Sequence, residues 1–233
     1  IQSALPQRRF YFDVKWLIII AIVAFLLVFQ VFPLVYMLYK AFFPESAFSL
    51  SVFQRLYTYQ MNLGALKNTL IAATVTMVLG TLIAFPLAWL VGRTNMYGKK
   101  FFRSLFVLTY MVPPYLGAMA WTRLLNPNAG TINTFLRELL NIDARSGPLN
   151  IYTIAGMIWV LTTFYYPYAF ITISRAMEKM DPSLEEAARI SGASPLKTVA
   201  TITLPMMTPS LIAGALLVFV KTLSEYGTPY TLG

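Results

Sequence analysis

Residues 186–205 read EAARISGASPLKTVATITLP and separate two long apolar runs. This stretch and the residues just before it carry the signals of a short helix. Asp181 is placed to cap the helix, and Pro182 suits its first turn. Gly192 stands where a left-handed residue would end it. The pattern predicts a helix over Asp181–Ser191 that lies parallel to the membrane, between two spans.

The predicted helix has an acidic start and one face of small side chains. Glu185 and Glu186 lie in its first turn, near the positive end of the helix dipole. After Gly192, Ser194 and Pro195 predict the cap of a second helix that leads back into the membrane. The small face suits a groove on another protein better than a core of its own, and its members are three or four residues apart: Leu184, Ala187, Ala188 and Ser191.

The spacing of this stretch resembles the EAA loop of ABC importer permeases, the binding-protein-dependent inner-membrane components. The family pattern is E-A-A, three residues, G, nine residues and I-x-L-P. Every fixed position is present: Glu186, Ala187, Ala188, Gly192, Ile202, Leu204 and Pro205. The resemblance implies that the loop is a coupling helix that docks on a separate ATP-binding subunit. The alternative is a chance amphipathic loop, which has no reason to match both halves of the pattern.

The composition indicates a membrane protein. The 233 residues are 58% hydrophobic and 12% charged, whereas a soluble domain is about one quarter charged. The chain has neither Cys nor His, so we expect no disulfide, no metal site and no catalytic residue. The net charge of +9 lies in short loops beside apolar runs, and membrane orientation explains it better than nucleic-acid binding.

Five segments are apolar enough to cross a bilayer as helices, which takes about 20 residues each. None shows the alternation of a strand, so the predicted class is all-α, a bundle of membrane helices. The resemblance implies the fold of a type I ABC importer permease. The five predicted spans are Trp16–Phe43, Asn68–Gly92, Phe101–Leu125, Ile151–Arg175 and Met206–Glu225.

The charged residues predict the orientation of these spans and the organisation of the chain. With a cytoplasmic N-terminus, eleven Lys and Arg flank the spans inside and six outside, as the positive-inside rule requires. We expect a cytoplasmic segment over 1–15, then a first helix with an external loop over 16–67. The permease core follows over 68–233, with the cytoplasmic coupling loop at 176–205. The family normally has a further helix, so we expect the core to be incomplete at its C-terminus.

The second span carries small residues at every fourth position. Such a stripe lets another helix approach closely, so we predict a packing seam rather than a ligand site. The members of the stripe are Ala72, Thr76, Gly80, Ala84 and Ala88.

Two places are candidates for the translocation pathway, one in mid-membrane and one at the outer end of the last span. Pro113 and Pro114, followed by Tyr115, remove two backbone donors within the third span. The freed carbonyls are tolerated inside protein or beside a water-filled path, so the pair either kinks the helix or lines the pathway. Glu225 lies about 30 Å along the helix from Pro205. It shares a helix face with the residue four positions before it, Lys221, and is either a surface anchor or part of an external cavity.

The chain carries no nucleotide loop of its own. The nearest approach is GRTNMYGKK at 92–100, with five residues between the glycines and Lys after GK. A phosphate loop has four residues there and Ser or Thr after GK. We therefore expect ATP and Mg²⁺ to be bound by a partner and this chain to hold no cofactor.

The resemblance implies an assembly in the bacterial inner membrane. It consists of two permease halves, two ATP-binding subunits and a periplasmic solute-binding protein. The second permease half is either fused to this chain or separate. An ion-coupled secondary transporter and a membrane scaffold are the alternatives from other classes, and the first would need carboxylates within the spans, of which this chain has few.

Two stretches bear on the solute. PPYLGAMAW at 113–121 and SEYGTP at 224–229 resemble the ferric-iron branch of these permeases. That branch neighbours those for polyamine, thiamine and phosphonate. Ferric iron is the solute that the resemblance favours, although no residue here dictates it by coordination chemistry.

Overall fold

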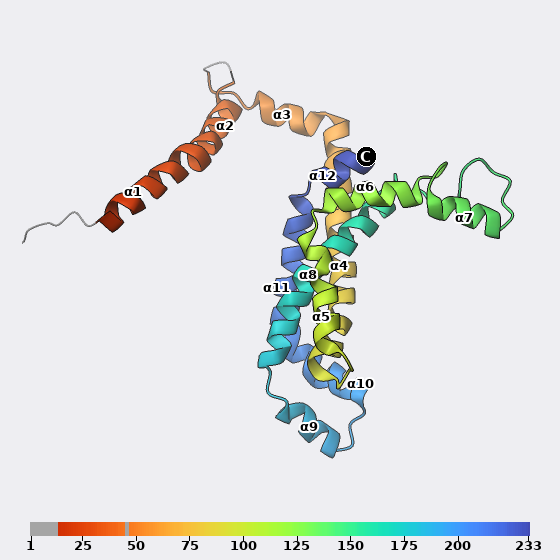
Figure 1. Cartoon of the computed structure of the whole chain (residues 1–233). Helices are drawn as coiled ribbons and strands as arrows, with labels where there is room; N and C mark the ends of the chain where they lie inside the picture. Colours follow the sequence, from red (N-terminus) through yellow and green to blue (C-terminus); the bar gives the residue numbers. More distant parts are fainter. Residues whose placement is uncertain (1–13, 45–46) are drawn as a thin grey trace, which may run out of the picture. The chain divides into compact units, whose positions relative to one another are not determined.

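The computed structural model describes residues 14–44 and 47–233 (Figure 1). The predicted N-terminal segment over 1–15 lies almost entirely outside them. Within the described residues the secondary structure is helical and contains no strand, which confirms the all-α class. The chain divides into two compact units, residues 1–64 and residues 65–233.

The first unit contains one long apolar helix. Helix α1 (Val14–Leu26), the π-helical turn η1 (Leu27–Val31) and α2 (Phe32–Phe42) follow one another without interruption. The most apolar window of 18 residues in this 29-residue run has a mean hydropathy of 3.0, and none of that window is buried within the chain. A helix that is apolar on every side and covered by no protein is suited to lipid. Helix α3 (Ser51–Thr58) follows after a loop.

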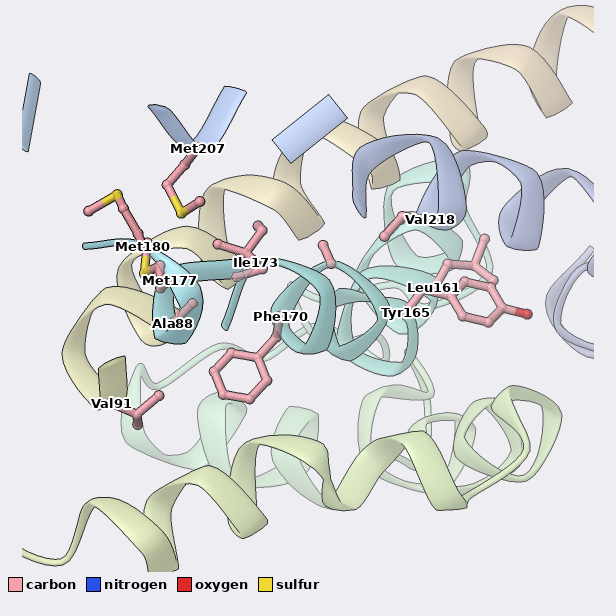
Figure 2. Packing of buried hydrophobic residues seen from close by; sticks show 12 residues of the cluster. Ala88, Val91, Leu161, Tyr165, Phe170, Ile173, Met177, Met180, Met207 and Val218 are labelled. Carbon is pink, nitrogen blue, oxygen red and sulfur yellow. The ribbon is translucent and has the colours of Figure 1, made fainter. Parts of the chain in front are cut away.

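The second unit is a bundle around α8 (Ile154–Lys179). Helix α4 (Gln60–Arg93), which begins in the first unit, packs against it from one side, and α11 (Leu204–Leu223) from another. Figure 2 shows Ile173 on the side of α8 that faces Met207 of α11, whereas Phe170 points the other way, where its ring centroid lies 5.7 Å from that of Phe106. The predicted small-residue stripe of α4 is buried along its length, which confirms the packing seam.

The third predicted span is not one helix. Residues 101–125 fall in α5 (Lys99–Val107), the 3-10 turn η2 (Leu108–Met111) and α6 (Pro114–Leu125). The chain is extended at Val112, as expected for a residue before proline, and Pro114 occupies the first turn of α6. The proline pair therefore separates two helices instead of kinking one. Among the described residues, four continuous runs are long and apolar enough to cross a membrane: Val14–Phe42, Asn62–Arg93, Ile154–Lys179 and Pro195–Leu223.

The shorter elements gather at the two ends of the bundle (Figure 1). Helices α9 (Ser183–Ile190) and α10 (Pro195–Thr198) lie at one end, which we call the α9 end. Helix α6 packs against α12 (Gly227–Leu232) at the other, which we call the α12 end. Helix α7 (Thr131–Leu139) follows α6 in the loop before α8.

Candidate functional site

Helix α9 begins two residues later than predicted. Pro182 is the residue before its first turn, and Asp181 Oδ1 accepts a hydrogen bond of 2.9 Å from the backbone N–H of Ser183. Asp181 therefore still caps the start of the helix, although from one position further out. This backbone hydrogen bond lowers the pKa of the Asp181 carboxyl, because it favours the charged form.

The end of α9 depends on Gly192. Its φ is +83°, and the N–H groups of Gly192 and Ala193 donate to the carbonyls of Arg189 and Ala188, both at 3.0 Å. This pair of bonds is a Schellman motif. A Cβ atom on Gly192 would meet nothing within 4 Å, so the positive φ alone calls for glycine. The predicted helix stop is therefore correct in its residue and in its conformation.

The second cap also forms where the sequence places it. Ser194 Oγ accepts from the backbone N–H of Lys197 at 3.4 Å, with Pro195 in the first turn of α10. From there α10, the π-helical turn η3 (Val199–Thr203) and α11 form one helical run. Pro205 lies in the first turn of α11, directly after the π-helical turn. A proline cannot donate to the carbonyl four residues back, which relaxes the constraint on the turn before it.

The residues that match the EAA pattern are mostly open to solvent. Glu186, Ala187, Leu204 and Pro205 are exposed, whereas Ala188 and Ile202 are partly buried. The small face of α9 is likewise left without a cover in this chain, and its Leu184 is 47% exposed. An exposed face of small residues on a capped helix is suited to contact with another protein.

A buried glutamate precedes the matched pattern. Glu185 is 6% exposed, and its Oε1 accepts from Thr203 Oγ1 at 2.6 Å. Its Oε2 lies 3.7 Å from Arg93 Nε, and Arg93 Nη2 donates to the carbonyl of Met180 at 2.8 Å. Sequence reasoning assigned Glu185 to the helix dipole and Arg93 to membrane orientation, and so it missed this contact. One signal in the sequence could have indicated it. Adjacent residues of a helix point about 100° apart, so Glu185 and Glu186 face different surroundings, and one of them can face the protein while the other faces solvent.

A polar hollow of about 190 Å³ lies beside this contact, between the loop after α4 and the start of α9. Lys99 and Arg189 line it together with Arg93, and Glu185 and Glu186 add negative charge. The hollow therefore offers both signs of charge rather than a single-sign anion site.

At the α12 end, the structure brings together two of the predicted pathway positions. Tyr115 of α6 lies against Gly227, where an added Cβ would come within 2.8 Å of the Tyr115 Cβ. Glu225 is two residues away, in the turn between α11 and α12. Pro113 is exposed, Pro114 is partly buried and Tyr115 is 44% exposed, so this corner keeps one open side.

Glu225 is bound by neutral donors. Its Oε2 accepts from Tyr165 Oη of α8, and its Oε1 accepts from the backbone N–H of Thr228 at 3.0 Å and from Thr228 Oγ1 at 3.2 Å. Lys221, which the sequence places on the same helix face as Glu225, is not its partner, because these two described residues form no ion pair. Helix α11 ends at Leu223, so the i, i+4 geometry is lost. Lys221 Nζ instead lies 5.4 Å from the ring centroid of Tyr168.

The fold and these two sites define a membrane helix bundle with an exposed helical loop at one end. The model of the family described as "Binding-protein-dependent transport system inner membrane component" matches residues 84–233. The chain therefore belongs to this family, and the family resemblance of the 186–205 stretch is confirmed.

Similar proteins include several named permeases. The molybdenum transport system permease protein ModB of Haemophilus influenzae is 29% identical over 73% of this chain and 72% of its own length. A probable molybdenum ABC transporter permease protein of Haloferax volcanii is 27% identical over 75% of this chain, which spans only 61% of that protein. The sulfate transport system permease protein CysT of Salmonella typhimurium is 28% identical over 70% of this chain and 56% of its own length.

A solved structure supports the same fold. A bacterial ABC transporter involved in the import of the acidic polysaccharide alginate matches with a TM-score of 0.74, over 94% of this chain and 79% of that chain. Its sequence identity is 17%, so the likeness concerns the fold. None of the relatives named here is named for iron, and the ferric-iron branch is not part of what these likenesses support.

Proposed function

We propose that this chain is the membrane-spanning permease subunit of an ATP-driven importer of the bacterial inner membrane. The observation that carries the proposal is the α9 loop, a capped helix that presents Glu186 and Ala187 outward at the spacing of the EAA pattern. Two ATP-binding subunits, which hold ATP and Mg²⁺, dock on this loop and on that of a second permease half. A periplasmic binding protein delivers the solute.

The proposal includes five membrane crossings with the N-terminus inside. Four are the continuous helical runs, and the fifth is α5, η2 and α6 together, broken at Pro113. With the N-terminus inside, the chain is back in the cytoplasm after the fourth crossing and outside after the fifth. The α9 end, between these two crossings, is therefore cytoplasmic, and the α12 end, after the fifth, faces out. The count of Lys and Arg in the loops supports this orientation.

At the outer end we assign Glu225 to the translocation pathway, with Pro113, Pro114 and Tyr115 beside it. Glu225 lines a hollow of about 90 Å³ together with Asn68, Thr69 and Thr222. An ionisable group held by hydroxyls within a membrane bundle marks a polar path more often than an anchor. Tyr115 is 44% exposed and lies against Gly227, two residues from Glu225, so it is placed to line the same path.

For the solute we propose ferric iron, on the resemblance of residues 113–121 and 224–229 to that branch. An oxyanion is the second candidate, because the relatives are named for molybdenum and sulfate. Polyamine, thiamine and phosphonate are the remaining family alternatives.

The experiment reconstitutes the chain with its ATP-binding subunit, second half and binding protein in vesicles. Uptake of labelled ferric iron, molybdate and sulfate is compared with and without ATP. ATP-dependent uptake of ferric iron is the expected result. Uptake of molybdate instead would move the assignment to the oxyanion class, and uptake driven by an ion gradient without ATP would contradict the importer proposal.

A further inference from the structure

We propose that Glu185, and not its neighbour Glu186 in the EAA pattern, is the positioning residue that passes movement of α9 to the membrane helices. The proposal rests on the proposed function, in which α9 contacts an ATP-binding subunit. It concerns how the contact is transmitted within this chain, a role that the EAA spacing does not assign to any residue.

Glu185 is the buried residue of α9. The other side chains of this helix are exposed or, at Ala188, partly buried. Glu185 is therefore the side chain of α9 that enters the bundle, beside the packing of the helix against α10 and η3. Movement of α9 therefore acts on the buried Glu185 carboxylate and its partners.

The carboxylate contacts two membrane helices directly and a third through Arg93. Thr203, which donates to Glu185 Oε1, is 0% exposed and is the last residue before α11. Arg93, whose Nε lies 3.7 Å from Glu185 Oε2, is the last residue of α4. The same guanidinium binds the carbonyl of Met180, the residue that follows α8. One side chain thus links α9 to the ends of α4, α8 and α11.

Burial makes this link difficult to break during movement. The side chains of Arg93 and Glu185 are 10% and 8% exposed, so separating them would leave two charges away from water without a partner. Tilting of α9 is then less costly when α4 and the start of α11 follow it. A second ion pair, between Arg103 of α5 and Glu178 of α8, is 41% and 45% exposed and has no such constraint.

The test uses the complete transporter in vesicles and compares Glu185→Gln with Glu178→Gln. Glutamine keeps an oxygen for Thr203 but removes the charge that faces Arg93. The measured quantity is solute imported per ATP hydrolysed, together with the amount of ATP-binding subunit that co-purifies. We expect Glu185→Gln to lower the ratio at least about fivefold, the lower range of coupling between sites, with the subunit still bound. Glu178→Gln is the matched control and should keep the wild-type ratio.

Two further variants guard against a folding defect. Thr203→Val removes one hydrogen bond without touching a charge and should lower the same ratio, and Thr203→Ser, which keeps the hydroxyl, should restore it. If uptake and ATP hydrolysis fall in the same proportion in all variants, Glu185 supports only stability and the inference is overturned. If the wild-type chain binds no ATP-binding subunit, the proposed function itself fails and the inference falls with it. A wild-type complex that couples normally, beside an unchanged ratio in Glu185→Gln, overturns the inference alone.

Discussion

The two ends of the bundle each hold a glutamate that accepts a hydrogen bond from a hydroxyl of another element. At the α9 end, Glu185 is buried, and Arg93 supplies the opposite charge. At the α12 end, Glu225 is partly buried and takes neutral donors from Tyr165 and Thr228. The same side chain therefore serves two purposes. A buried carboxylate opposite a cation resists separation, whereas the carboxylate of Glu225 has neutral donors and no cationic partner among the described residues, which fits the pathway role proposed for it.

The largest expected effect comes from Arg93→Ala, which breaks the ion pair at the α9 end. The variant leaves Glu185 charged without a cationic partner and the Met180 carbonyl without its donor. Loss of one partner of a buried pair costs about 3–5 kcal/mol, so recovery of folded protein should fall strongly. Thermal unfolding in detergent measures the loss. Arg103→Ala, at the exposed pair, is the control and should shift the midpoint little.

The next effect is that of Gly192→Ala at the same end. The methyl group has room, so its cost comes from the positive φ alone, about 1–2 kcal/mol. The end of α9 should fray, and less ATP-binding subunit should co-purify. Gly64→Ala is the matched control, because that position also has open space but lies within helix α4 without a positive φ. Equal recovery of the subunit from both variants would contradict the role of the Schellman motif.

The prediction for the α12 end is Glu225→Gln. Glutamine keeps the shape and one acceptor oxygen, for Thr228, and its NH2 group can donate to the Tyr165 hydroxyl, so the fold should change by about 1–2 kcal/mol. Uptake should fall several-fold, about the effect of losing one charged contact, while the ATP-binding subunit still docks at the far end of the bundle. Uptake is measured by a transport assay and docking of the ATP-binding subunit by co-purification, both on the same preparation. Unchanged uptake would show that Glu225 is a surface anchor. The proposed difference in role between Glu185 and Glu225 would then be wrong.

The smallest effect concerns Asp181 and pH. Its pKa is lowered in the folded protein by the hydrogen bond from Ser183, so its contribution to the start of α9 is present above the unfolded pKa of about 3.9 and is lost as the pH falls through the folded value. Docking of the ATP-binding subunit should therefore be insensitive to this group near neutral pH. Asp181→Asn should weaken docking slightly at neutral pH and remove the acid-dependent part. A wild-type loss of docking already near pH 6 would point to another group.

Local chemistry made much of this structure predictable from the sequence. The helix stop at Gly192 and the cap at Ser194 follow from backbone preferences, and the stripe along α4 follows from residue size. The break at Pro113 was recognised as a disturbance, but whether a proline pair kinks a helix or separates two depends on the neighbouring helices. The sequence predicted a helix from Met206 to Glu225 with Lys221 and Glu225 on one face. Helix α11 ends at Leu223, so Glu225 lies in the turn after it and the shared face is lost.

The ion pair at the α9 end was not predictable in the same way. Arg93 and Glu185 are far apart in the sequence, and each has an adequate local explanation, as a positive-inside charge and as a first-turn acid. Only packing of α4, α8 and η3 around the start of α9 makes them partners. The EAA pattern identifies the exposed residues that a partner would contact. It gives no information about Glu185, the adjacent residue that points into the bundle.

The central claim is that the exposed face of α9 is the docking surface for an ATP-binding subunit. The chain contains no cysteine, so a single introduced thiol can be cross-linked without interference from its own residues. Ala187→Cys places the thiol on that face, and Ala129→Cys places one at an exposed alanine between α6 and α7. With a thiol-to-amine cross-linker on the assembled transporter, we expect Ala187→Cys to form a covalent product with the ATP-binding subunit and Ala129→Cys to form none. A product from Ala129→Cys, or none from Ala187→Cys in a complex that still hydrolyses ATP, would contradict the claim.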